Sequence, residues 1–90
     1  MTDFSAAVSR VLLATSPGDV VSYGELAAEA GFPGAARAVG NLLKELDEVP
    51  WWRVVTTTGR LAPGHELEQA RRLRSEGVLV VARHVARFEP

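Results

Sequence analysis

The chain has 90 residues, the size of one small domain, because so short a chain can hardly build a second hydrophobic core. Apolar residues make up 47% of it and the formal net charge is -1, which excludes a disordered tail and a strongly basic nucleic-acid coat. The absence of cysteine excludes a disulfide framework, a thiolate metal site and a cysteine nucleophile.

The sequence also disfavours a metal site, a membrane-spanning segment and a signal peptide. His65 and His84 are the only histidines, and their spacing matches no metal-binding pattern, so we expect neither metal nor cofactor. No apolar run approaches the roughly 20 residues that span a bilayer, and Asp3 stands where a signal peptide would be basic. We therefore expect a cytoplasmic protein with no membrane partner, and a monomer.

The first predicted element is an amphipathic helix from about Asp3 to Ala14. Phe4, Val8, Val11 and Leu12 recur at helical spacing, which places them on one face against the core. The sequence Ser-Pro-Gly-Asp at 16–19 is typical of a turn and ends this helix.

A second helix is predicted from Tyr23 to about Ala30. Ser22 and Glu25 have the spacing of a capping box, in which the hydroxyl and the carboxylate bind free amides at the start of a helix. Gly31 can end the helix in a left-handed conformation, and Pro33 prevents its continuation.

A third helix is predicted to begin at Gly34. Its broad apolar side consists of Ala35, Ala38, Val39, Leu42, Leu43 and Leu46. Two short helices joined by the tight turn at 31–34 form a candidate helix-turn-helix unit. Such units also occur in proteins that never bind nucleic acid, so DNA binding does not follow from this geometry alone.

The pattern changes after Pro50. β-Branched residues on either side of Thr58-Gly59 predict a short hairpin or paired strands. A further helix follows Pro63 and Gly64, with Leu67, Ala70 and Leu73 on its inner face, and ends at Gly77. Residues 78–81 are apolar β-formers, and 82–90 are expected to be extended or loosely ordered. The predicted fold is one domain over 1–90, mainly α with short β strands, containing a winged-helix-like helix-turn-helix unit.

Two residues of the helix-turn-helix unit are candidates for DNA contact. Arg37 lies among small residues, which would let the helix approach a surface closely while the guanidinium projects into it. The alternative is an ordinary solvated arginine. Tyr23 follows the cap residue at a helix N-terminus, where backbone amides suit a phosphate; alternatively, it is a half-buried packing residue.

Both tryptophans of the chain, Trp51 and Trp52, lie side by side between Pro50 and Arg53. In an extended chain they would point in opposite directions, so either one enters the core while the other faces outward and is free to stack on a nucleobase, or both line opposite walls of a loop. Arg53 could lie over an aromatic ring or pair with one of Glu45, Asp47 and Glu48. The paired carboxylates of the chain have no histidine, serine or metal ligand at a catalytic spacing.

Three segments together resemble the DNA-binding domain of O6-alkylguanine-DNA alkyltransferases, and in particular the alkyltransferase-like proteins. They are VVSYGELAAEAG, GAARAVGNLL and VPWWRVV, in the family's order and at similar spacing. In the true enzymes the last motif reads Pro-Cys-His-Arg-Val, and its cysteine accepts the alkyl group. Trp51 stands at the cysteine position here, which is the mark of the non-enzymatic branch, and an indole has no thiolate to act as nucleophile.

The resemblance implies roles for individual residues. Arg37 matches the arginine that fills the space left by a rotated nucleotide, Tyr23 matches the tyrosine that guides this rotation, and 35–43 would be a recognition helix in the minor groove. The resemblance implies the following DNA-binding set: Ser22, Tyr23, Ala36, Arg37, Ala38, Gly40 and Asn41. The implied lesion pocket consists of Tyr23, Trp51, Trp52, Arg53, Val54, Val55 and Gly64, with 54 and 55 presenting backbone groups and Gly64 widening the pocket.

One departure from the family pattern concerns the residue after Trp51. Most relatives keep histidine there, which in the enzymes relays a proton to a glutamate before a glycine; Glu76 and Gly77 match that pair, whereas this chain has Trp52. The relay cannot operate, but the indole N–H could still donate to Glu76 as a structural bond. This is a hypothesis that a structure can test.

The resemblance implies a non-enzymatic protein that binds O6-alkylguanine in duplex DNA, flips it out and flags it for nucleotide excision repair. Duplex DNA and nucleotide excision repair proteins are the implied partners. The alternative is a DNA-binding or protein-interaction module of the same fold that has lost lesion recognition, and Trp52 is the residue that favours it.

Overall fold

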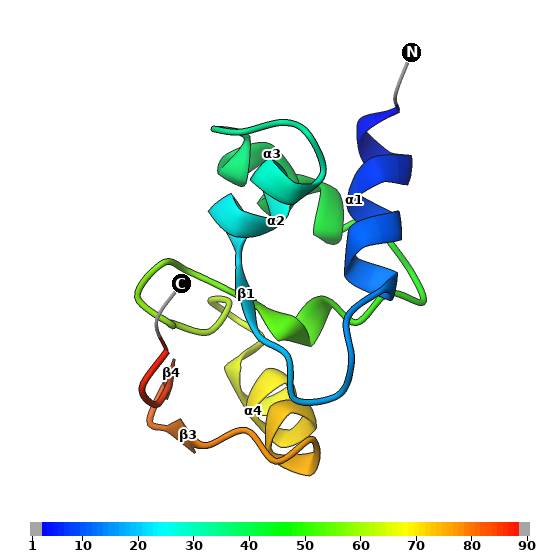
Figure 1. The fold of residues 1–90 in the computed structure, drawn as a ribbon. Coiled ribbons are helices and arrows are strands. Elements are labelled where there is room, and N and C mark those ends of the chain that lie inside the picture. The colour runs from blue at the N-terminus through cyan, green and yellow to red at the C-terminus, as the bar shows by residue number, and fades with distance from the viewer. Residues whose placement is uncertain (1–2, 89–90) are drawn as a thin grey trace.

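The computed structural model describes residues 3–88. Its first element is helix α1 (Phe4–Leu13), which begins where predicted because the Asp3 carboxylate accepts a hydrogen bond from the Ser5 amide at 3.1 Å. The buried face of α1 carries Ala7, Val8 and Leu12. Figure 1 shows α1 alongside the helix-turn-helix unit in the upper half of the molecule.

The predicted helix-turn-helix unit is present. Helix α2 (Tyr23–Glu29) starts with the expected capping box, in which Glu25 N donates to Ser22 Oγ at 3.0 Å and Ser22 N donates to Glu25 Oε1 at 2.9 Å. Gly31 has a φ of +95°, the left-handed conformation that ends the helix. Helix α3 (Ala36–Leu43) follows and packs against α2, and it ends three residues before the predicted limit at Leu46.

Two short sheets complete the fold. Strand β1 (Val21–Ser22) pairs in parallel with β2 (Val54–Val55), which follows the 3₁₀ helix η1 (Trp51–Arg53). Strands β3 (Val80–Val81) and β4 (His84–Val85) form an antiparallel pair near the C-terminus.

The predicted hairpin around Thr58 and Gly59 is only partly correct. A turn does form, since the Gly59 amide donates to the Thr56 carbonyl at 2.8 Å and Gly59 has a φ of +87°. The strand before the turn pairs with β1, however, and Arg60 after the turn bridges to His84. Local pairing across the turn is limited to the Thr56 amide, which donates to the Arg60 carbonyl at 3.0 Å, and the other strand partners are distant in sequence.

Helix α4 (Glu66–Ser75) lies below the other helices in Figure 1. Its buried face carries Gln69, Ala70 and Leu73, whereas Leu67 is 91% exposed, so the prediction of Leu67 as an inner residue is wrong. With 3.6 residues per turn, Leu67 lies about a hundred degrees round the helix from the centre of that face. A buried polar residue, Gln69, takes the inner position instead.

The core has two adjoining parts. One joins α1, the helix-turn-helix unit and Val54, and the other joins Val55 to Leu61, α4 and the C-terminal hairpin. Strand β2 thus lies at the boundary, with Val54 and Val55 both fully buried. Within residues 3–88 no helix is long and apolar enough to cross a membrane.

Candidate nucleic-acid interface

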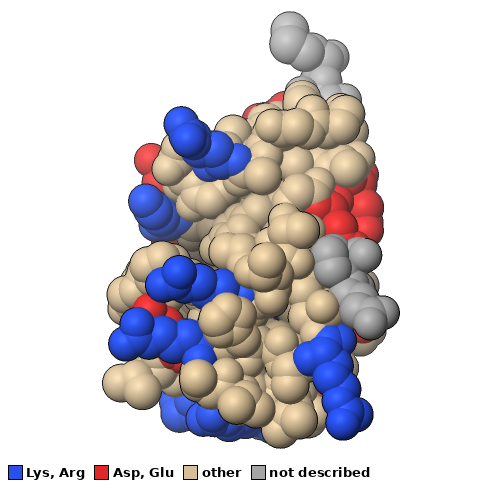
Figure 2. Space-filling model, turned by 90° about the vertical axis from the view of Figure 1, so that its left-hand side faces the viewer, with Lys and Arg blue, Asp and Glu red and all other residues tan. Residues whose placement is uncertain are grey.

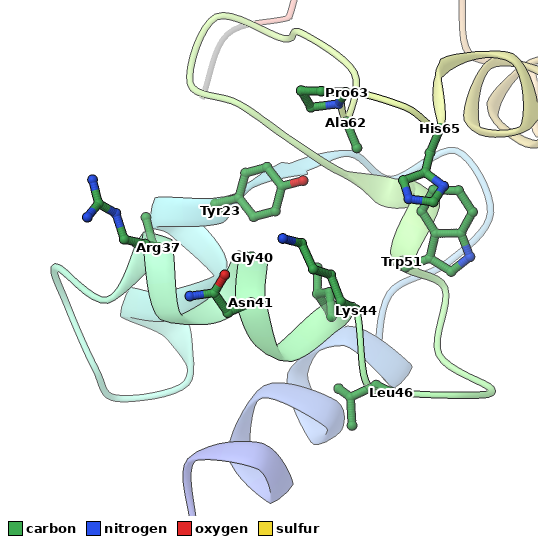
Figure 3. A pocket seen from close by; sticks show the side chains of 12 residues that line it. Tyr23, Arg37, Gly40, Asn41, Lys44, Leu46, Trp51, Ala62, Pro63 and His65 are labelled. Carbon is green, nitrogen blue, oxygen red and sulfur yellow. The ribbon is translucent and has the colours of Figure 1, made fainter.

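An open cleft of about 800 Å³ separates α3 from the loop that leads into α4. Figure 3 shows Arg37 at one end, Trp51 and His65 at the other, and Tyr23, Asn41 and Lys44 between them. The lining consists of Tyr23, Ala36, Arg37, Gly40, Asn41, Leu43, Lys44, Leu46, Trp51, Ala62, Pro63 and His65. It includes two permanent cations and no carboxylate, so the cleft favours an anionic partner.

Charge is unevenly distributed over the surface although the formal net charge is only -1. In Figure 2 lysine and arginine side chains follow one side of the molecule and its lower end, while the largest acidic patch in that view lies on the opposite side. A local basic surface is therefore available without an overall basic chain.

Helix α3 presents one face to the cleft. Gly40 and Asn41 lie three and four residues after Arg37, Lys44 lies four and three residues after them, and all four line the cleft. Ala36 lines it as well, whereas Ala38 is exposed outside the lining. The sequence-based set omitted Lys44, although the same periodicity from Arg37 would have identified it.

Tyr23 forms a wall of the cleft at the start of α2. Its ring packs against Gly40, where an added Cβ would lie 3.8 Å from Tyr23 Cε1. Burial raises the pKa of the Tyr23 hydroxyl, so the group stays protonated and can donate a hydrogen bond. Ser22 is buried, and its hydroxyl is engaged by the capping box, so it supports Tyr23 from outside the lining.

Trp51 forms the far wall. Its ring is edge-to-face with His65, at 5.8 Å between centroids, and with Trp52, at 6.1 Å and an interplanar angle of 86°. The expectation that the two tryptophans alternate as in an extended chain is wrong, because residues 51–53 form a 3₁₀ turn. Both rings consequently pack against each other, and Trp51 is the one that reaches the cleft.

Arg53 points away from the cleft and is buried. The expected ion pair with Glu45, Asp47 or Glu48 is wrong, since Arg53 Nη2 lies 2.9 Å from Glu76 Oε2. The alternative contact with an aromatic ring is present, because the Arg53 guanidinium carbon is 5.6 Å from the Trp52 ring centroid. Trp52, behind the Trp51 wall, therefore packs against a buried ion pair.

The hypothetical bond between Trp52 and Glu76 is confirmed. Trp52 Nε1 donates to Glu76 Oε2 at 2.8 Å. The Arg53 hydrogen bond is the largest of the causes that lower the pKa of Glu76 to about 2, and donation from Gly18 and Trp52 adds to it against the opposing effect of burial. The carboxylate is thus ionised and acts only as an acceptor near neutral pH.

Trp52, Arg53, Val54, Val55 and Gly64 do not line the cleft. The first four lie behind the Trp51 wall. Gln69 holds this segment by donating to the carbonyls of Trp52 and Val54 at 3.0 and 2.9 Å while accepting from Ala62 N at 2.7 Å. Of the backbone groups that 54 and 55 were expected to present to the lesion, the Val54 carbonyl is therefore already bonded within the protein.

Six lining residues lie outside the predicted site set: Leu43, Lys44, Leu46, Ala62, Pro63 and His65. From the loop 62–65, which the resemblance places at the pocket, only Gly64 was assigned to the site. Those of the loop before α4 reach Trp51 only through the tertiary fold, and no spacing in the sequence links His65 to Trp51. Among residues 3–88 no group of three or more histidine, cysteine, aspartate or glutamate side chains could hold a metal ion.

Comparison with known proteins identifies the relatives of this fold. Residues 3–78 match the profile described as 6-O-methylguanine DNA methyltransferase, DNA binding domain. The DNA base-flipping protein of Vibrio parahaemolyticus is 38% identical over 85 residues, which cover 89% of this chain and 85% of that protein.

Two solved structures superpose closely. Atl1 of S. pombe, in complex with damaged DNA containing O6-carboxymethylguanine, has a TM-score of 0.82 at 33% identity and covers 90% of this chain and 83% of its own. OGT of Mycobacterium tuberculosis in complex with DNA has a TM-score of 0.74 at 36% identity, covering 84% of this chain and 50% of its own. The chain belongs to the family of the 6-O-methylguanine DNA methyltransferase DNA-binding domain.

Proposed function

We propose that this protein recognises O6-alkylguanine in duplex DNA by holding the flipped nucleotide in the cleft against Trp51, without removing the alkyl group. The observation that carries the proposal is the position of Trp51, an aromatic wall at the end of a cation-lined cleft in a chain without cysteine. An indole offers a flat contact surface but no thiolate to accept an alkyl group.

The cleft geometry supports a flipping role for α3. Arg37 is exposed at the rim, and the neighbouring Ala36 and Gly40 are small, so the helix can approach a groove closely while the guanidinium enters the duplex. Rotation of the nucleotide costs a few kcal/mol of unstacking, and least where damage has weakened the pair. Tyr23 faces the same cleft with a protonated hydroxyl that can donate to a phosphate.

Relatives with this fold support the damage-recognition part of the proposal. One is described as a DNA base-flipping protein, and another was solved with DNA containing O6-carboxymethylguanine. We extend the proposal to a monomer whose complex with the lesion signals to nucleotide excision repair; this step rests on the family resemblance.

The proposal is tested by titrating matched duplexes that contain guanine or O6-methylguanine at one position. We expect tighter binding of the lesion by at least about tenfold, equivalent to 1.4 kcal/mol. A preference below about threefold, less than 1 kcal/mol, would instead favour a DNA-binding module that has lost lesion recognition.

The non-enzymatic part has its own measurement. After incubation with a duplex carrying the alkylated guanine, the protein should keep its unmodified intact mass and the lesion should be recovered unchanged. A gain in protein mass equal to one alkyl group would contradict it.

A further inference from the structure

Trp52 is held on several sides although it does not line the cleft. Its Nε1 donates to Glu76 Oε2 at 2.8 Å, and the Arg72 guanidinium carbon lies 4.7 Å from its ring centroid. Arg72 is in turn paired with Glu68 at 2.6 Å, and Arg53 approaches the same indole at 5.6 Å. The ring therefore has a bonded edge and charged groups nearby, which leaves it little rotational freedom.

The acceptor of this bond is itself fixed by Gly18 and Arg53, and Arg53 is in turn bonded to Thr15. Glu76 Oε1 accepts from Gly18 N and from Arg53 Nε, each at 3.0 Å, while Oε2 also accepts from Arg53 Nη2 at 2.9 Å. Arg53 Nη1 donates to the carbonyl and the hydroxyl of Thr15 at 3.1 and 2.8 Å. The carboxylate thus connects the end of α1, the following turn, η1 and the end of α4.

Trp51 is in direct contact with Trp52, with their ring centroids 6.1 Å apart. Within residues 3–88 the Trp51 indole makes no side-chain hydrogen bond, so packing alone orients it. Its ring makes edge-to-face pairs with Trp52 and with His65, and it also packs against the part of the core that includes Val54. His65 lies at the exposed N-terminal end of α4, whereas Trp52 is anchored by the Glu76 bond. Trp52 is accordingly the more rigid of the two supports.

We infer that Trp52 is a positioning residue, whose N–H bond to Glu76 holds Trp51 in the orientation of a cleft wall before DNA arrives. The inference rests on the proposed function, because it gives the lesion site a preformed aromatic surface. Preorganisation of this kind increases affinity by lowering the entropy lost on binding. A site of proton relay in related enzymes serves here to orient a binding surface.

Two variants separate the hydrogen bond from simple ring packing. In Trp52→His the imidazole keeps a ring N–H that can donate to Glu76, whereas in Trp52→Phe the ring remains but no donor does. Both variants leave Trp51 as the sole tryptophan, because the chain has only two. Time-resolved fluorescence anisotropy of the DNA-free proteins, at a temperature where both are folded, then reports the motion of Trp51 alone.

We expect a larger fast depolarisation of Trp51 in Trp52→Phe than in Trp52→His. Adding Glu76→Gln to the Trp52→His variant should raise the fast depolarisation of Trp51 to the level seen in Trp52→Phe. Adding Glu29→Gln, a substitution at the distant end of α2, is the control and should not raise it. Equal anisotropy decays in Trp52→His and Trp52→Phe would overturn the inference, and so would a Glu76→Gln substitution without effect.

DNA titration gives a second readout that a purely structural role would not change. The preference for O6-methylguanine over guanine should be at least about threefold lower in Trp52→Phe than in Trp52→His, with equal affinities for undamaged duplex. Equal lesion preferences would overturn the inference. If the wild-type protein showed no lesion preference, the proposed function would fail, while the anisotropy comparison would still decide whether Trp52 positions Trp51.

Discussion

Arg53 and Glu76 form an ion pair behind the candidate DNA-binding cleft, with 2.9 Å between Nη2 and Oε2 and side chains only 8% and 11% exposed. Each carboxylate oxygen accepts two hydrogen bonds, so the pair has the additional partners that make burial of charge tolerable. Its loss would leave a buried guanidinium without a counter-charge.

The free energy of unfolding should therefore depend on pH in the acidic range. The pKa of Glu76 is lowered from 4.5 to about 2, so its contribution to the free energy of unfolding is complete above pH 4.5 and is lost as the pH falls toward 2. Urea denaturation across this range should show wild-type stability falling more steeply than that of Glu76→Gln. At pH 7 the variant should be less stable by about 3 kcal/mol. Parallel pH profiles for the two proteins would contradict this assignment.

Gln69 should be as important to the fold as an apolar core residue. It is fully buried and bonds three backbone groups, from Trp52, Val54 and Ala62. Replacing it with leucine leaves these groups unpaired at about 1–3 kcal/mol each. We expect Gln69→Leu to lower the free energy of unfolding by about 3 kcal/mol or more in urea denaturation. A loss below about 1 kcal/mol would mean that water replaces these bonds.

Gly40 should be required for DNA contact and not for folding. An added Cβ would meet only Tyr23, at the ordinary distance of 3.8 Å. Gly40→Ala should therefore stabilise α3 by about 0.5–1 kcal/mol in thermal or urea unfolding. Gly40→Leu should keep the fold but weaken DNA binding at least about tenfold, because the longer side chain prevents close approach of the helix. Unchanged affinity in Gly40→Leu would place the DNA elsewhere.

Arg37 and Lys44 should affect binding in different ways, although both line the cleft. Arg37→Ala should weaken binding of the lesion about tenfold and that of undamaged duplex less, because the extrahelical state loses its filling group. Lys44→Ala should weaken binding of the lesion duplex and of the undamaged duplex equally. It should also reduce the steepness with which the logarithm of the DNA association constant falls with the logarithm of salt concentration by about 0.9, the value for one phosphate contact. Arg71→Ala, on an exposed arginine paired with Glu68, is the matched control and should change neither. Identical effects of the two cleft variants would contradict these separate roles.

Local signals in the sequence were sufficient to predict much of the fold. The Ser22 and Glu25 capping box and the left-handed Gly31 are short-range devices, and the helix-turn-helix unit appears where they place it. Trp51 and Tyr23 were both assigned to a common site, and the structure brings them to one cleft. Motif spacing was sufficient there because it matched the order of the family's motifs.

The remaining features depend on partners distant in sequence. The parallel pairing of Val54 with Val21 was not predicted, and the ion-pair partner of Arg53 is Glu76 and not a nearby carboxylate. Alternation in an extended chain does not predict the 3₁₀ turn at 51–53, which follows Pro50 directly. Periodicity also cannot show that a polar residue, Gln69, would displace Leu67 from the inner face of α4.

Extrahelical capture of the damaged nucleotide can be measured directly. A duplex is prepared with O6-methylguanine opposite a fluorescent cytosine analogue whose emission is quenched by base stacking. Saturating protein should raise its emission, because rotation of the lesion into the cleft removes the partner of the analogue, whereas the guanine duplex should show no rise at equal saturation. Emission that stays quenched in the fully bound lesion duplex would contradict recognition by nucleotide flipping.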